Sequence, residues 1–286
     1  MKSEEFSGKA FSLLADSGST KTEWCLAAGG SAFRRWETSG INPFFQSEAE
    51  IRRLLRVSVC PRLPGASLRS VRFYGAGCIG EKAVCLRRLL EQELQPSGEV
   101  CVDTDMAGAA RALCGRSPGI ACILGTGSNS CFYDGEKIVA NVPPLGFILG
   151  DEGSGAVLGK LLVGEVLKGR WPASLSEAFY AWAGMRQADI IDRVYRQPFP
   201  NRFLAGFAPF LLQHISEPLV SGLVEGSFRA FFQRNVMQYD YVRYPAHFTG
   251  SVAFYFRPQL EAAAQAAGVR VGNVVRRPME RLVGSD

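Results

Sequence analysis

The stretch ADSGSTKTEW, residues 15–24, separates two apolar segments that each have the composition of a β-strand. It sets one carboxylate, Asp16, just before a tight turn made of Gly18, Ser19 and Thr20. Such a turn lets backbone N–H groups and hydroxyls point at one spot, which suits phosphate oxygens. Asp16 would repel a phosphate unless a cation lay between them, and Mg²⁺ prefers oxygen ligands. The stretch therefore predicts a phosphate turn with a metal at Asp16, against the alternative of a plain hairpin of small residues.

This turn is not a Walker A loop. Lys21 follows Thr20 rather than a glycine, and no glycine opens a G-x-x-x-x-G-K pattern. A phosphate bound here would instead lie between two hairpins, one from each of two domains.

A second stretch of the same design begins near residue 119. GIACIL reads as a strand, GTGSN (residues 125–129) as a glycine and hydroxyl turn, and two further strands follow around the tight turn DGEK. The first half reads β-β-β-α-β-α-β-α, and both halves open with three hairpin-linked strands. We therefore expect an α/β protein with a repeated architecture and two domains, residues 1–117 and 118–286.

Two acidic motifs lie where strands give way to helices. DTDMAG places Asp103 and Asp105 at the end of an expected strand, Val100 to Thr104, and ligand crevices of α/β folds lie at such ends. GDEGSG places Asp151 and Glu152 in a glycine-rich turn before an apolar helix. Asp103 or Asp105 could cap the helix that follows the first motif. Glu152 could likewise cap the helix that follows the second motif. A cap does not explain two acids, so we expect a catalytic base at Asp103 or Asp105.

Gly250 and Ser251 form a further strand-to-helix turn in HFTGSVAF. Because Gly250 has no side chain, the backbone here can approach a flat purine or a ribose closely. A helix cap at Ser251 explains the serine equally well.

The motif GAGCIG, residues 75–80, matches the dinucleotide fingerprint G-x-G-x-x-G between an expected strand and a helix. Three strands joined by hairpins precede it, whereas a dinucleotide-binding domain starts with that unit. NAD binding is kept as the alternative.

Composition excludes several other classes. A net charge of +5 over 286 residues does not call for nucleic acid, and no segment is long and apolar enough for a signal peptide or a membrane span. The eight cysteines form no C-x-x-C pair, so buried thiols are expected rather than zinc or disulfides. The two histidines, His214 and His247, lie in apolar surroundings, which leaves serine-hydrolase chemistry without its usual base. We expect a cytoplasmic protein.

In this order, the motifs resemble those of the N-acetylglucosamine kinase and benzoyl-CoA reductase activator ATPase family, within the sugar kinase, actin and heat-shock chaperone superfamily. DSGSTKT resembles the first phosphate loop, GTGSN the second and GSVA the adenosine turn. The likeness covers nearly the whole chain. It implies two ribonuclease-H-like domains around a central cleft, the actin-like ATPase fold, with ATP and Mg²⁺ as cofactors, a small sugar as substrate, and a homodimer.

The resemblance also implies a role for each matching residue. Asp16 would hold Mg²⁺ and Asp105 would accept the proton of the attacking sugar hydroxyl. The sugar would be held by Asn42, Gly77, Thr126, Asn129 and Asp151. ATP would be held by Gly18, Ser19, Thr20, Lys21, Gly125, Thr126, Gly127, Ser128, Gly250 and Ser251. The most direct substrate is N-acetylglucosamine, phosphorylated to its 6-phosphate.

One departure bears on the substrate. Kinases of the family often carry a Ser-Gly-Gly turn against the sugar, where this chain has Gly75, Ala76 and Gly77. The missing hydroxyl puts specificity for an acetamido sugar in question.

Two alternative functions are kept for a protein of this family. One is an activator-type ATPase, which would need cysteines for a shared iron–sulfur cluster. The other is a regulatory ATP-binding protein without a base.

Overall fold

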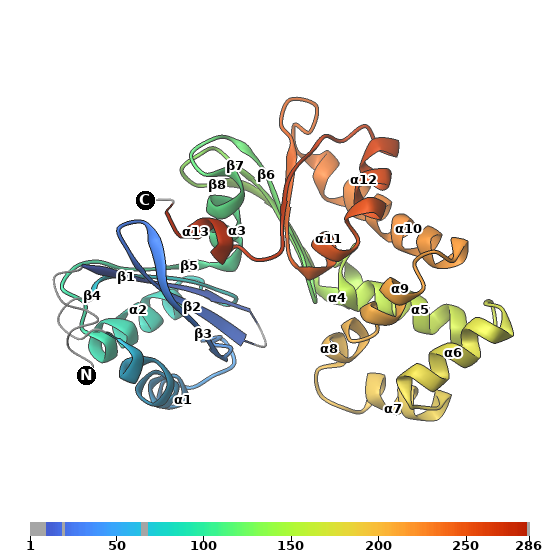
Figure 1. Cartoon of the computed structure of the whole chain (residues 1–286), viewed down its shortest axis with the longest axis horizontal. Helices are drawn as coiled ribbons and strands as arrows, with labels where there is room; N and C mark the ends of the chain where they lie inside the picture. The colour runs from blue at the N-terminus through green and yellow to red at the C-terminus, as the bar shows by residue number, and fades with distance from the viewer. Residues whose placement is uncertain (1–9, 19–20, 64–67, 285–286) are drawn as a thin grey trace. The chain divides into compact units, whose positions relative to one another are not determined.

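The computed structural model describes residues 10–18, 21–63 and 68–284 (Figure 1). The chain forms two compact units: Met1–Gly115 with Pro278–Asp286 as unit 1, and Arg116–Arg277 as unit 2. The internal boundary lies close to the one expected after residue 117. The last segment differs from expectation, because it packs with unit 1 rather than closing the second domain.

Unit 1 follows the β-β-β-α-β-α-β-α order expected from the sequence, with a last short helix from the C-terminal segment. Its elements are β1 (Phe11–Ser17), β2 (Lys21–Ala28), β3 (Ser31–Ser39), α1 (Glu48–Leu54), a π-helical turn (Leu55–Val59), a 3₁₀ turn (Cys60–Arg62), β4 (Leu68–Gly75), α2 (Glu81–Leu94), β5 (Val100–Thr104), α3 (Asp105–Cys114) and α13 (Met279–Leu282).

The described strands of unit 1 form one sheet in the order β3-β2-β1-β4-β5. β1, β2 and β3 pair antiparallel, whereas β1, β4 and β5 run parallel. The carboxyl ends of the three parallel strands therefore meet at one edge of the sheet, where α/β folds bind ligands.

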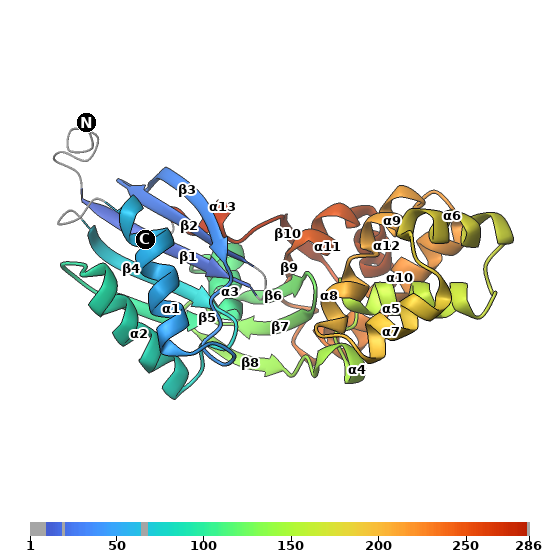
Figure 2. The same ribbon diagram turned by 90° about the horizontal axis from the view of Figure 1, so that it is seen from below.

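Two apolar cores cover the two faces of this sheet. On one face, Leu13 and Phe73 pack with Ile51 of α1 and Leu86 of α2. On the other face, residues of β1, β2, β4 and α3 pack with Met279 and Leu282 of α13. Figure 2 shows α1 and α2 together on their side of the strands. Burial of Met279 and Leu282 explains why the C-terminal segment belongs to unit 1.

Unit 2 begins with the same succession of three strands and then inserts a run of helices. Its elements are β6 (Gly119–Leu124), β7 (Ser128–Tyr133), β8 (Ile138–Val142), α4 (Gly146–Leu149), α5 (Gly155–Leu167), α6 (Ala173–Ala183), α7 (Gln187–Tyr195), α8 (Pro200–Ala205), α9 (Ala208–Gln213), α10 (Pro218–Arg234), a 3₁₀ turn (Val236–Gln238), β9 (Ala246–Thr249), α11 (Ser251–Tyr255), α12 (Arg257–Ala266) and β10 (Val271–Val275).

The described strands of unit 2 repeat the topology of unit 1. Their order is β10-β9-β6-β7-β8, with β6, β7 and β8 antiparallel and β6, β9 and β10 parallel. If the strands of each unit are numbered one to five along the chain, both sheets have the spatial order 3-2-1-4-5. The prediction of two domains with a repeated strand architecture is confirmed.

The core of unit 2 joins β6 and β9 to the inserted helices through a large cluster of phenylalanines, leucines and valines. Among the described residues, no helix combines the length and apolar character needed to cross a membrane.

Candidate active site

The carboxyl edge of the unit 1 sheet brings predicted site residues together. Tyr74 of β4 is the register partner of both Asp16 on β1 and Asp103 on β5. Register partners on parallel strands project from the same face, so these two carboxylates flank Tyr74. Asp105 follows directly after β5 at the same edge.

The turn after β1 is closed by a backbone hydrogen bond, since Gly18 N–H donates to Lys21 O at 3.0 Å. Behind it, the buried hydroxyls of Ser17 and Thr22 lie 2.7 Å apart. The ammonium of Lys21 pairs with Glu37 on β3 at 2.6 Å. The predicted phosphate ligands Ser19 and Thr20 lie outside the described residues.

The loop after β3 carries Asn42 and is pinned to this turn. Ile41 N–H donates to Ser17 Oγ at 3.0 Å, and Ser17 Oγ donates back to Ile41 O at 2.9 Å. Asn42 Oδ1 accepts from Phe44 N–H at 2.9 Å. Gly77 approaches Asn42 so closely that an added Cβ would lie 2.2 Å from Asn42 Oδ1. The fold thus joins two predicted sugar-binding residues that are far apart in sequence.

Asp105 is the first residue of α3 rather than its cap. Thr104 caps the helix, because its hydroxyl accepts from Ala107 N–H at 3.1 Å. The expectation that both acids lie at the end of one strand therefore holds for Asp103 and is wrong for Asp105. The interpretation of either acid as the helix cap is wrong as well.

The two acids also differ in environment. Burial raises the pKa of Asp105, partly offset by the hydrogen bond that Asp105 accepts from Met106 N–H. Asp103 is exposed and accepts from Thr104 N–H at 2.7 Å. A carboxylate whose pKa is raised toward neutrality is the better proton acceptor at physiological pH, which favours Asp105 as base.

Cys78 lies close to both acids. Burial, and then the charges of Asp105 and Asp103, raise the pKa of its thiol to about 12. The segment GAGCIG, which contains Cys78, therefore lies beside Asp105 and the Asn42 loop. A Cβ added at Gly75 would meet Phe73 and Ser17, and one added at Gly77 would meet Asn42, whereas Gly80 has open space. The preceding antiparallel strands and these contacts do not fit the dinucleotide alternative.

In unit 2, the GTGSN turn is held from both sides. Gly125 N–H donates to Gly127 O at 2.9 Å, and Ser128 N–H donates to the Asp151 carboxylate at 3.3 Å. Asp151 is buried, has a left-handed φ of 57°, and has a pKa raised by burial. An added Cβ at Gly127 would lie 3.0 Å from Asp151 Oδ2. Asp151 therefore lies directly against the second phosphate turn.

The start of α5 completes this arrangement. Gly155 N–H donates to Gly125 O at 2.8 Å, and Ala156 N–H donates to Thr126 O at 3.1 Å. Ser154 caps the helix, and Glu152 instead pairs with Arg234 at 2.9 Å. The capping interpretation of Glu152 is therefore wrong.

Position 250 requires glycine, because the backbone of Leu124 lies too close for any side chain. The φ of Gly250 is +111°, and an added Cβ would lie 2.3 Å from Leu124 O at the end of β6. Gly250 occupies the cap position of α11 and Ser251 is the first helical residue, so the expectation of a cap at Ser251 is wrong. The GSVA turn and the GTGSN turn thus lie side by side.

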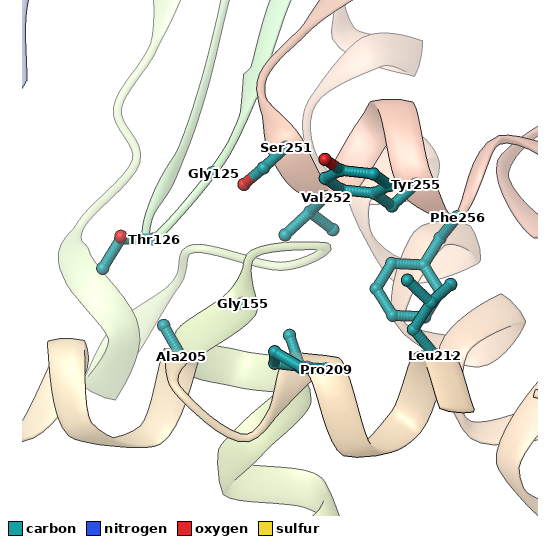
Figure 3. A pocket seen from close by; sticks show the side chains of 11 residues that line it. Gly125, Thr126, Gly155, Ala205, Pro209, Leu212, Ser251, Val252, Tyr255 and Phe256 are labelled. Carbon is teal, nitrogen blue, oxygen red and sulfur yellow. The ribbon is translucent and has the colours of Figure 1, made fainter. Parts of the chain in front are cut away.

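A pocket of about 370 Å³ opens between these two turns, and all the residues that line it belong to unit 2. In Figure 3, Ser251 and Tyr255 of α11 face the segment from Ala205 to Leu212 across it. Thr126 lies at one end, and Phe256 and Leu212 lie at the other. An added Cβ at Gly125 would meet no atom within 4 Å, so the glycine leaves room here for a ligand.

The apolar wall of this pocket was not predicted, because its residues belong to no recognisable sequence motif. They are Ala205, Ala208, Pro209 and Leu212. Tyr255 could have been found, because it lies four residues after Ser251 and so on the same face of the helix. Asn129 is half-buried on β7, and its Oδ1 accepts from Asn141 Nδ2 at 2.9 Å.

Within the described part of the chain, no three His, Cys, Asp or Glu side chains gather into a metal site. This fits Mg²⁺ bound by one carboxylate together with water and phosphate oxygens, as at Asp16, and not a cage made wholly of protein ligands. All eight cysteines are free thiols that are buried or half-buried.

No protein-family model and no curated protein sequence matches the chain. Among solved structures, the putative N-acetylglucosamine kinase from Porphyromonas gingivalis is 53% identical, with a TM-score of 0.92, over 96% of this chain and 97% of that one. The chain belongs to the N-acetylglucosamine kinase family.

More distant solved structures share the fold. A putative N-acetylglucosamine kinase from Chromobacterium violaceum is 19% identical with a TM-score of 0.71, over 97% of this chain and 99% of that one. A ROK family glucokinase from Streptomyces griseus, solved with glucose and AMPPNP, is 13% identical with a TM-score of 0.57, over 97% of this chain and 98% of that one. These likenesses show the fold, which is the two-domain actin-like ATPase fold expected for the family.

Proposed function

We propose that this member of the N-acetylglucosamine kinase family transfers a phosphoryl group from ATP to an amino sugar, most directly to the 6-hydroxyl of N-acetylglucosamine. The observation that carries the proposal is the edge of the unit 1 sheet, where a carboxylate with a raised pKa, Asp105, lies near Asp16 and the Asn42 loop. The identity of 53% to the Porphyromonas gingivalis protein supports the same substrate class.

The residues of unit 2 supply the nucleotide site in this proposal. Gly125, Thr126, Gly127 and Ser128 hold phosphate oxygens through the turn, while Gly250 and Ser251 hold the nucleoside. The pocket supports this assignment, because an apolar wall and an aromatic ring suit a flat base, and the hydroxyls suit ribose and phosphate. Gly18, Ser19, Thr20 and Lys21 hold the phosphates from unit 1.

Asp16 holds Mg²⁺, which when bound neutralises charge on the transferred phosphate. Phosphoryl transfer needs positioning and electrostatic stabilisation more than covalent chemistry, so the chain's task is to align the two substrates.

The chain's remaining site residues act on the sugar. Asp105 accepts the proton of the attacking hydroxyl. Its neighbour Asn42 donates a hydrogen bond through Nδ2, with Gly77 behind it. Asp151, Thr126 and Asn129 supply further hydrogen bonds. The absence of a serine in the Gly75–Gly77 turn leaves the acetamido group to be recognised by other residues.

The two alternatives have weaker support. An activator-type ATPase needs accessible thiolates for an iron–sulfur cluster, whereas burial raises the pKa of the Cys78 and Cys114 thiols to about 12. A regulatory ATP-binding protein would have no need of the acid at Asp105. A cytoplasmic location suits a kinase that uses ATP, and a homodimer stays a prediction of the resemblance.

A coupled ADP-release assay over a panel of hexoses and amino sugars tests the proposal. We expect N-acetylglucosamine to give the highest kcat/KM, with glucose and glucosamine lower. Calorimetric titration should show binding of Mg²⁺-ATP and none of NAD. NAD binding without ATP binding would overturn the kinase assignment.

A further inference from the structure

Gln46 closes the loop that carries Asn42 with both ends of its side-chain amide. Gln46 Oε1 accepts from Asn42 N–H at 2.8 Å, and Gln46 Nε2 donates to Gly40 O at 3.1 Å. The backbone N–H groups of Phe45 and Gln46 also both donate to Asn42 O at 3.1 Å. The Gln46 side chain thus holds the backbone at Gly40 and at Asn42.

Pro43, directly after Asn42, is buried and anchors the loop on its far side. Phe44 and Phe45 are 67% and 80% exposed, so burial of their rings does not fix the loop. The chain is anchored on the near side at Ile41, which is buried and hydrogen-bonded to Ser17. Between Ile41 and Pro43, the backbone of Asn42 is held by the Gln46 side chain, while the Asn42 side chain contacts Phe44 N–H and Gly77.

Gln46 is itself firmly placed, because it directly precedes the start of α1. Ser47 caps that helix in a capping box with Glu50, in which Ser47 N–H donates to the Glu50 carboxylate at 2.7 Å. A capping box satisfies backbone donors at the start of a helix and so stabilises its first turn. The Gln46 side chain therefore links the rigid end of α1 to the loop.

The orientation of the Asn42 amide follows from these contacts. Its Oδ1 is occupied by Phe44 N–H and lies against Gly77. Within the described part of the chain, its Nδ2 makes no hydrogen bond, so it remains a donor for a ligand. A shift of the Asn42 backbone would move this donor and so weaken the hydrogen bond that it makes to the sugar.

We propose that Gln46 is the positioning residue that sets Asn42 for sugar binding. This inference rests on the proposed function, in which Asn42 contacts the sugar. The residues that line the nucleotide pocket all belong to unit 2 and do not include Gln46, so we expect its substitution to act on the sugar.

Kinetics of Gln46→Leu, Gln46→Glu and a matched control test this role. Leucine removes both side-chain hydrogen bonds, whereas glutamate keeps the acceptor for Asn42 N–H and loses the donor to Gly40. Gln265→Leu is the control, since Gln265 is exposed on α12. We expect Gln46→Leu to raise the KM for N-acetylglucosamine about tenfold, with kcat and the KM for ATP within about twofold. Gln46→Glu should fall between wild type and Gln46→Leu, and Gln265→Leu should match wild type.

A double-mutant cycle with Asn42→Ala separates positioning from general damage. If Gln46 acts through Asn42, adding Gln46→Leu to Asn42→Ala should change the sugar KM by less than about twofold. An equal effect in both backgrounds, or an unchanged sugar KM in Gln46→Leu, would overturn the inference.

Amide hydrogen exchange gives a readout that does not need turnover. Exchange at Asn42 should be faster in Gln46→Leu than in wild type, and unchanged in Gln265→Leu. A wild-type protein without sugar-dependent ADP release would refute the proposed function, while faster exchange in Gln46→Leu would still support the loop contact. Unchanged exchange at Asn42 would refute the positioning role whatever the activity.

Discussion

Replacement of Gly77 by alanine should damage sugar binding far more than stability. The new Cβ would lie 2.2 Å from Asn42 Oδ1, so the amide must move by more than about 1 Å to reach the ordinary contact distance of about 3.5 Å. Gly77 has a φ of +77°, and a left-handed residue other than glycine costs about 1–2 kcal/mol. Because the atom in the way is the end of a flexible side chain, the clash itself adds little to that cost.

Gly80→Ala is the matched control. Gly80 lies in the same segment with a φ of +53°, but an added Cβ would meet no atom within 4 Å. Both variants should lose free energy of unfolding in urea titrations, and Gly80→Ala should lose at least as much, because its ψ of −129° lies outside the left-handed region. Only Gly77→Ala moves Asn42, and we expect its kcat/KM for N-acetylglucosamine to fall by about 100-fold in a coupled ADP-release assay. Equal loss of activity in the two variants, or full sugar affinity in Gly77→Ala, would refute the contact between Gly77 and the sugar site.

Three further predictions concern the metal, the base and the nucleotide. Asp16→Asn should abolish Mg²⁺-dependent turnover with an unchanged circular dichroism spectrum; activity within about tenfold of wild type would contradict the metal assignment. Asp105→Asn should lower sugar-dependent ADP release by about 10²–10⁴-fold at constant ATP affinity, and Asp103→Asn should do much less. Since burial raises the pKa of Asp105, its ionised form costs stability that is regained as pH falls, so Asp105→Asn should raise the melting temperature at pH 7 but not near pH 3. GTP should replace ATP within about tenfold, because an apolar base pocket discriminates weakly, whereas Tyr255→Ala should weaken both nucleotides; strict ATP selectivity would contradict the pocket assignment.

Regular elements were predictable wherever local composition was decisive. The strands Val100–Thr104 and Gly119–Leu124 have the bounds expected from the sequence. Glycine and hydroxyl turns marked the hairpins of both units, and their repetition revealed the two related sheets.

Features that depend on contacts between distant segments were not predictable. The C-terminal helix joins unit 1 because Met279 and Leu282 fill an apolar core there, which no local pattern indicates. Thr104, not an acid, caps α3, since its hydroxyl reaches Ala107 N–H. The role of Gln46 lies in two hydrogen bonds that only the folded loop brings together.

Mass spectrometry of the reaction products tests the kinase assignment most directly. Purified protein with Mg²⁺-ATP and N-acetylglucosamine should yield one N-acetylglucosamine 6-phosphate for each ADP released, and no ADP without the sugar. Release of ADP with no phosphorylated sugar, from this substrate or any other amino sugar, would contradict the account and favour a bare ATPase.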